Sequence, residues 1–191
     1  MSEEIKHIKE VINKFQTGYI HRNIDNLDTF MDLFCNDELE IIGTGAYKRG
    51  SGEWCVDKKT VRKLIADDWE SWGDLRLNTD QLDINIQNQT AWFATTGTVS
   101  RTIEPGKSYQ NFIGYMKWLT ENEPEVSSKE KLLDVLQAAV STLAEADRGK
   151  DYIWPIRFSA VLVKQNNQWR FCQMTFSFPT IYPPDVRLTE F

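Results

Sequence analysis

The most informative segment of the sequence is residues 166–180, which read NNQWRFCQMTFSFPT. Apolar and polar residues alternate after Asn166-Asn167, and this period of two predicts a long strand that follows a tight turn. The more apolar set should face the core, and it consists of Cys172, Met174, Phe176 and Phe178. The other set should face outward, toward a partner subunit, and it consists of Trp169, Phe171, Gln173, Thr175 and Ser177.

Three further segments have the alternation of strands. Residues 153–164 precede the Asn166-Asn167 turn and complete a hairpin, while residues 75–86 and 91–103 form a second pair. The parity of the apolar positions changes between Leu77 and Leu82, which predicts a bend or bulge near residues 78–81. The sequence therefore predicts four long antiparallel strands.

Helical periodicity precedes and interrupts these strands. Apolar residues recur at spacings of three and four over residues 3–20, over about 27–34, and again after Asp57, a plausible helix cap. Between the two hairpins lies a helical insertion at about residues 104–150, whose second helix begins with a capping box of Ser127 and Glu130. We expect its apolar positions to face inward: Leu132, Leu133, Leu136, Ala139, Val140 and Leu143. The fold class is α+β, with helices leading and a curved antiparallel sheet following.

The length and the net charge of the chain argue against several classes of function. A chain of 191 residues with 41% hydrophobic content predicts one domain with a substantial core. A net charge of -6 argues against nucleic acid and against an anionic membrane surface as partners. The beginning of the chain lacks a secretory pattern and no apolar run has membrane-spanning length, so we expect a cytoplasmic location.

The histidines and cysteines limit the chemistry. His7 and His21 are the only histidines, and one helix would separate them by roughly 21 Å, so they cannot share a metal ion. We expect neither a metal nor a cofactor. Cys35, Cys55 and Cys172 are odd in number and lie far apart in the sequence, which favours reduced, mostly buried thiols.

Asp68 is the candidate catalytic residue. It lies on the apolar stripe of the third helix, where burial would raise the pKa of its carboxyl and make it a general base near neutral pH. Polar residues share faces with large rings elsewhere, as Arg157 does between Trp154 and Phe158, and this arrangement is typical of a small-molecule pocket. The candidate ligand-binding residues are Trp54, Trp69, Trp72, Tyr115, Trp118, Trp154, Arg157, Met174 and Phe176. Two structural alternatives stay open: the rings fill a core, and Asp68 pairs with an arginine such as Arg157.

The order of these segments resembles a SnoaL-like domain of the nuclear transport factor 2-like (cystatin-like) superfamily. The resemblance rests on residues 41–45 (IIGTG), Glu53-Trp54, residues 68–74 (DWESWGD) and the closing strand 169–179. It covers most of the chain and implies a single domain over residues 1–191, built as a cone-shaped barrel. A bent sheet wraps round the first helices, a pocket lies inside, and a homodimer commonly forms through the sheet.

The closing strand also departs from the family pattern. Relatives often have histidine where this chain has Thr175, although Ser177 and Pro179 match. Chemistry that depends on that imidazole is therefore not expected here.

Two functions remain open. The first is binding of a small, largely apolar organic ligand, with isomerase- or cyclase-type proton transfer in which Asp68 is the base and Arg157, Tyr115 or Gln173 polarises a carbonyl. The second is a non-catalytic, dimeric ligand-sensing or protein-interaction domain whose outer sheet face binds the partner subunit. The superfamily contains both kinds of protein, and the fold does not choose between them.

Overall fold

The computed structural model describes residues 3–46, 48–80, 82–104, 106–122, 127–148 and 150–178. Pro179 of the family pattern and Gln81 of the predicted bend lie outside these ranges. The chain forms two compact units, one from residues 1–100 and 154–179 and the other from residues 101–153 and 180–191.

The first unit begins with α1 (Glu3–His21), as the periodicity predicts. Its buried face consists of Ile8, Ile12, Phe15 and Tyr19. The helix predicted at about residues 27–34 is instead three short pieces: η1 (Ile24–Asn26), α2 (Leu27–Phe30) and η2 (Met31–Leu33). Leu27, Phe30 and Met31 are nevertheless buried, so the apolar spacing predicted the packing face correctly but not the continuity of the helix. Helix α3 (Lys58–Ser71) follows Asp57, which caps it as expected.

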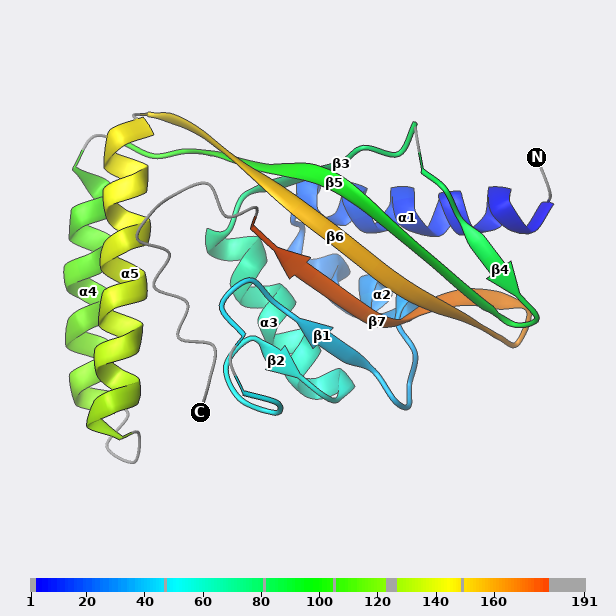
Figure 1. Cartoon of the computed structure of the whole chain (residues 1–191), viewed down its shortest axis with the longest axis horizontal. Helices are drawn as coiled ribbons and strands as arrows, with labels where there is room; N and C mark the ends of the chain where they lie inside the picture. The colour runs from blue at the N-terminus through cyan, green and yellow to red at the C-terminus, as the bar shows by residue number, and fades with distance from the viewer. Residues whose placement is uncertain are drawn as a thin grey trace. The chain divides into compact units, whose positions relative to one another are not determined.

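A mixed, mostly antiparallel sheet packs against these helices. Its strands are β1 (Glu40–Ile42), β2 (Trp54–Cys55), β3 (Asp74–Leu77), β4 (Asn85–Gln87), β5 (Thr90–Thr102), β6 (Asp151–Gln165) and β7 (Gln168–Ser177). The strand order is β2-β1-β7-β6-β5-β3, and β4 pairs with β5 beside this path. In Figure 1 the long strands β5, β6 and β7 run side by side, and α1 and α2 are seen behind them.

Two details of the sheet differ from four simple antiparallel strands. The segment predicted as one strand is divided into β3 and β4, which both pair with β5, and this division explains the change of parity after Leu77. Strand β1 pairs in parallel with β7, with Ile41 opposite Met174. Parallel pairing is possible because no hairpin joins the two strands, which are separated by most of the fold.

A β-bulge interrupts the closing strand. Val161 of β6 lies opposite Gln173, but the next residue, Leu162, lies opposite Phe171, so Cys172 is the extra residue of β7. Because of the bulge, the residues before Cys172 point to the opposite face of the sheet from the one that uninterrupted alternation predicts. Our assignment of Trp169 and Phe171 to the outer face is therefore wrong, since they are 4% and 0% exposed.

Beyond the bulge the predicted faces are correct. Met174 and Phe176 are buried, whereas Gln173, Thr175 and Ser177 on the other face are partly exposed. Cys172, which was assigned to the inner face, is half-buried at the bulge itself.

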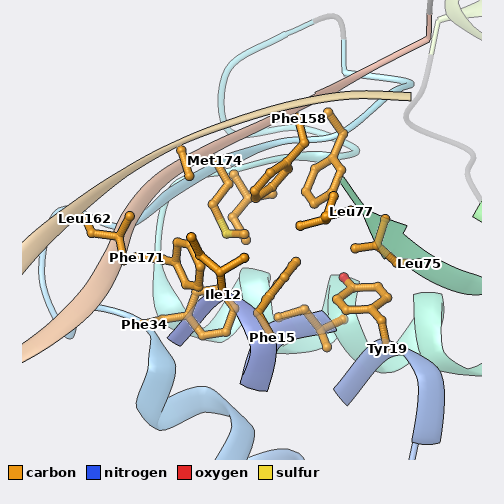
Figure 2. Close-up of a cluster of buried hydrophobic side chains, with 14 of the residues drawn as sticks. Ile12, Phe15, Tyr19, Phe34, Leu75, Leu77, Phe158, Leu162, Phe171 and Met174 are labelled. Atoms are coloured by element: carbon orange, nitrogen blue, oxygen red, sulfur yellow. The ribbon is translucent and has the colours of Figure 1, made fainter. Parts of the chain in front are cut away.

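The core of the first unit is rich in aromatic rings. Figure 2 shows Ile12, Phe15 and Tyr19 of α1 pointing toward side chains of the sheet, among them Phe158, Phe171 and Met174. Phe15 contacts both sheet phenylalanines, with ring centroids 5.8 Å from Phe158 and 5.3 Å from Phe171. Such tilted and stacked pairs add to the free energy gained from burial. Much of the aromatic content therefore fills a core.

The second unit contains α4 (Lys107–Asn122) and α5 (Ser128–Arg148), which pack against each other. The capping box is confirmed, because Ser127 Oγ accepts the Glu130 N–H at 3.2 Å and Glu130 Oε2 accepts the Ser127 N–H at 3.1 Å. The inward orientation of three leucines is wrong: Leu132, Leu136 and Leu143 are 62%, 46% and 65% exposed. A single neighbouring helix covers only part of the wide apolar stripe of α5.

Candidate functional site

Asp68 lies in the last turns of α3, at the margin of the core. The helix begins after Asp57, whose side chain accepts the Thr60 N–H at 2.8 Å. Val61 and Ile65, seven and three residues before Asp68, are fully buried. Residues at these spacings share a helix face, so Asp68 turns inward with them and is half-buried. The predicted position of Asp68 on the apolar stripe is confirmed.

A buried tyrosine is the hydrogen-bond partner of this carboxyl. The Tyr19 hydroxyl donates to Asp68 Oδ2 at 2.9 Å, which links α1 to α3. The sequence reasoning did not select Tyr19 as a site residue. A signal was available, because Tyr19 alone among the buried residues of α1 has a polar tip that needs a partner.

Burial controls the protonation of the pair. It raises the pKa of Asp68 from 3.8 to about 7, and the negative charges of Glu53 and Asp67 act in the same direction. The hydrogen bond from Tyr19 opposes this shift, because it stabilises the carboxylate. Burial and the Asp68 charge raise the pKa of Tyr19 well above 10, so its phenol stays protonated. Near neutral pH Asp68 can therefore take up and release a proton.

Glu53 is a second acidic residue that sequence reasoning did not select. Its Oε2 accepts the Gly45 N–H at 2.6 Å and lies 3.5 Å from the Thr44 hydroxyl oxygen. A Cβ atom at Gly43 would lie 2.5 Å from this same oxygen, so the loop between β1 and β2 fits closely round the carboxylate. The loop thereby fixes a negative charge that acts on the pKa of Asp68.

Aromatic rings surround the Tyr19–Asp68 pair. The Tyr19 ring centroid is 6.5 Å from that of Trp69 and 5.8 Å from that of Trp72, and Trp72 is 5.6 Å from Phe176. Within the described ranges, the buried Trp69 Nε1 has no hydrogen-bond partner. The structure thus places a carboxyl, a phenol and an unpaired indole N–H within one aromatic cluster. Four of the predicted site residues, Asp68, Trp69, Trp72 and Phe176, meet there, and Met174 is buried in the same core.

The alternative in which Asp68 pairs with Arg157 is not found. Arg157 lies on β6 between the buried Ile156 and Phe158, so its exposed side chain points away from the core. Among the residues that the structure describes, no lysine or arginine forms an ion pair with Asp68.

The remaining predicted residues lie elsewhere. Trp54 donates its indole N–H to Glu40 Oε1 at 2.9 Å, at the β1–β2 edge of the sheet. Trp154 packs on Phe178 with ring centroids 4.5 Å apart. Tyr115 and Trp118 stack on each other on α4 of the second unit, which is not placed relative to Asp68.

An open groove of about 540 Å³ lies on the outer face of the sheet. It is lined by Asp83, Asn85, Trp92, Phe93, Ala94, Ser159, Ala160, Val161, Gln173 and Thr175. The outward alternation beyond the bulge brings Gln173 and Thr175 to the groove, while Met174 between them points into the core. The sequence suggests Gln173 as a group that polarises a carbonyl beside Asp68. Its side chain instead lies on the outer face of the sheet, on the other side from the core.

Neither a metal centre nor a membrane span is found in the described part of the chain. No three or more His, Cys, Asp or Glu side chains come together there in a way that could hold a metal ion. None of the described helices is both long and apolar enough to cross a bilayer.

Comparisons with known proteins agree with this architecture. A family model described as the SnoaL-like domain matches residues 8–116. A search of curated proteins found no match.

Solved structures of similar fold have low sequence identity to this chain. A ketosteroid isomerase-like protein from Erwinia carotovora atroseptica has a TM-score of 0.58 at 11% identity, covering 96% of this chain and 100% of that one. A nuclear transport factor 2-like protein of unknown function from Pseudomonas putida has a TM-score of 0.56 at 10% identity, covering 100% and 94%. A cystatin-like protein of unknown function from Nostoc punctiforme has a TM-score of 0.55 at 9% identity, covering 96% of both chains. The predicted α+β fold of the nuclear transport factor 2-like type is confirmed.

Proposed function

Because the chain belongs to the SnoaL-like domain family, we propose that it binds a small, largely apolar organic molecule with a carbonyl group at the Tyr19–Asp68 site. The observation that supports this most is the half-buried carboxyl of Asp68, whose pKa is raised to about 7 and which lacks a cationic partner among the described residues. A carboxyl used only to fix a core would be expected to have one.

The proposed chemistry is proton transfer next to the carbonyl of the ligand. Asp68 in its carboxylate form removes a proton from the carbon beside the carbonyl. An isomerase returns this proton to a different carbon, whereas in a cyclase the carbanion attacks a second carbonyl carbon of the ligand and the proton goes to the new alkoxide oxygen. Tyr19 stays protonated and holds the orientation of the carboxyl through its 2.9 Å hydrogen bond. The Trp69 N–H is the unpaired donor available to the ligand oxygen, on which negative charge develops during the reaction.

Access to this site passes Trp72. Its ring is only partly buried and packs edge-on against both Tyr19 and Phe176, whereas Trp69 is buried. A ligand that reaches Asp68 therefore replaces contacts of the Trp72 ring, and its own apolar surface takes their place against the cluster. The name of the isomerase-like structural neighbour fits this class of chemistry, but the fold alone does not assign it.

The experiment compares Asp68→Asn with Asp67→Asn, its exposed neighbour on the same helix. A small cyclic β,γ-unsaturated ketone is incubated with each protein in deuterated buffer, and its deuterium uptake and double-bond migration are followed by NMR. We expect wild type and Asp67→Asn to accelerate exchange, and Asp68→Asn to lose on the order of a hundredfold or more in rate. If Asp68→Asn left both ligand affinity and turnover unchanged, the catalytic proposal would be wrong.

We also propose that the outer face of the sheet joins two copies of this chain. The groove on that face has a 42% exposed Trp92 beside uncharged side chains of β6 and β7, including Val161, Gln173 and Thr175. Large exposed rings with few charges around them are typical of interface centres. This arrangement supports the second function, a dimeric ligand-sensing or interaction domain, and it is compatible with an active Asp68 on the other face.

A further inference from the structure

Cys35 and Cys172 are brought together by the bulge in β7, although 136 residues separate them in the sequence. Phe34 and Phe171, the residues that precede them, form an isolated parallel bridge, and the Cys35 N–H donates to the Phe171 carbonyl oxygen at 2.9 Å. Adjacent strands lie about 4.8 Å apart, within the Cα separation of about 4.4–6.8 Å that a disulfide spans. The backbone therefore places the two cysteines at neighbouring positions of adjacent chain segments, where the usual spacing lies within the range that a disulfide spans.

Each thiol also shifts the pKa of the other, as two neighbouring side chains do. The Cys35 sulfur lies 3.8 Å from the Arg170 carbonyl oxygen, and the Cys172 sulfur lies 3.8 Å from that of Glu38. Each side chain is thus held on the same small surface between the end of η2 and the bulge of β7. Both are free thiols in this structure.

The members of the pair differ in exposure. Cys35 is 1% exposed, whereas Cys172 is only half-buried and so can be reached by a solute. The neighbouring Cys35 thiol lowers the pKa of Cys172 to about 7, against the opposing effects of burial and of Glu38 and Glu40. The same contact raises the pKa of Cys35, which stays a thiol. Since the thiolate is the reactive form, Cys172 has the character of an attacking group and Cys35 that of its buried partner.

We propose that Cys172 and Cys35 form a redox modification site, in which a hydroperoxide oxidises Cys172 and Cys35 converts the product into an intramolecular disulfide. In the first step the Cys172 thiolate attacks the terminal oxygen of the hydroperoxide, the O–O bond breaks, and the departing alkoxide takes a proton from water. The sulfur loses two electrons and becomes a sulfenic acid. In the second step the Cys35 sulfur attacks the Cys172 sulfur, the S–O bond breaks, and hydroxide leaves with the Cys35 proton as water. The balance is two thiols and one hydroperoxide converted into one disulfide, one alcohol and one water.

The bridge would tie the segment after η2 to the closing strand of the sheet. It closes a long loop, which restricts the unfolded chain and should raise the melting temperature of the oxidised protein. Gln173, the residue after Cys172, lines the groove on the outer sheet face, so the modification site lies directly beside that groove. A thiol reductant reverses the bond by thiol–disulfide exchange.

The test uses the wild-type protein and hydrogen peroxide. Reduced protein is exposed to a small excess of peroxide and the remaining thiols are blocked with N-ethylmaleimide, after which intact mass and proteolytic peptides are measured. We expect the number of free thiols to fall from three to one, with Cys55 alone labelled and one peptide pair joined through Cys35 and Cys172. Three free thiols, or a disulfide that joins Cys172 of two chains, would overturn the proposal.

Three variants separate the roles. Cys172→Ser should prevent any intramolecular disulfide, while Cys35→Ser should accumulate a sulfenic acid at Cys172 that dimedone traps. Cys55→Ser is the matched control, because Cys55 is also buried but its sulfur faces the Gly52 carbonyl oxygen at 3.9 Å, and it should oxidise as wild type does. Disulfide formation that persisted in Cys172→Ser, or was lost in Cys55→Ser, would contradict the assignment.

Discussion

Asp68 combines two properties that are usually kept apart in a folded protein. It lies on a helix face with buried apolar residues, and the hydrogen bond that it receives comes from a neutral phenol rather than from a cation. The folded state therefore keeps a proton on this carboxyl in a pH range where an unfolded chain has released it. The protein is therefore less stable with this carboxyl than it would be with a hydrophobic side chain at the same position. Such a loss of stability is often found at functional sites.

The pH dependence of stability tests this property. Burial raises the pKa of Asp68 from 3.8 to about 7, so the free energy of unfolding should fall as the pH rises through this window and stay low above it. Asp68→Asn cannot ionise and should avoid the loss, gaining at most about 4 kcal/mol over wild type near pH 8 and little near pH 4. Urea unfolding at several pH values measures the difference. The exposed Glu70→Gln, on the same helix, is the control and should follow wild type, whereas Asp67→Asn should reduce the loss slightly because the Asp67 charge also raises the pKa of Asp68. An Asp68→Asn curve parallel to wild type would contradict the assigned shift.

At the scale of single residues, the sequence predicts which way a side chain faces more readily than it predicts the partner that the side chain contacts. The spacing of Asp68 from Val61 and Ile65 predicted its inward face, because helix geometry alone determines which residues share a face. Its partner Tyr19 is 49 residues away, and no local pattern relates the two. The same holds for Cys35 and Cys172, which are brought together by a bulge that moves every residue before it to the opposite face of the strand.

At the scale of elements, the start of α5 depends on local chemistry that the sequence shows directly. Ser127 and Glu130 exchange backbone hydrogen bonds and satisfy two N–H groups that the first turn of a helix leaves free. Such signals involve residues three apart and need no tertiary information. They therefore predict a helix start well, whereas the apolar stripe of α5 did not predict how much of the helix is covered.

Removing this cap should weaken the beginning of α5. We expect Ser127→Ala to lower helix stability by about 1 kcal/mol, since the N–H of Glu130 loses its acceptor. Amide hydrogen exchange of the first turns should accelerate correspondingly, while α1 stays protected. Ser128→Ala, one residue into the helix, is the matched control and should leave the exchange rates almost unchanged. Equal effects of the two substitutions would show that the capping box does not stabilise α5.

At the scale of the whole molecule, the sequence predicted the fold class better than the arrangement of its surfaces. The helices, the hairpin at Asn166-Asn167 and the family resemblance led to the correct α+β fold. The parallel β1–β7 pairing and the outer groove arise from contacts between distant segments, which periodicity does not reveal. The single domain over residues 1–191 stays a prediction, because the contacts group the chain into two units.

The proposed dimer predicts a specific response at Thr175. A carboxylate placed there would lie in the groove on the outer sheet face and would have to be desolvated in the interface. We expect Thr175→Asp to shift the protein toward monomer by at least tenfold in dissociation constant, with ligand binding at Asp68 retained. Sedimentation equilibrium measures the shift. Thr29→Asp, on the exposed side of α2, is the control; if both variants stayed as dimeric as wild type, the groove would not be the interface.

The ionisation of Asp68 is the feature from which the proposed function follows, and NMR can measure it directly. Selective carbon-13 labelling of aspartate allows each carboxyl to be titrated, and Asp68→Asn identifies the signal of Asp68 by its disappearance. We predict a midpoint of about 7 in wild type and a higher one in Tyr19→Phe, because the Tyr19 hydrogen bond lowers the pKa of Asp68. A wild-type midpoint close to 3.8, the ordinary value for aspartate, would contradict the account.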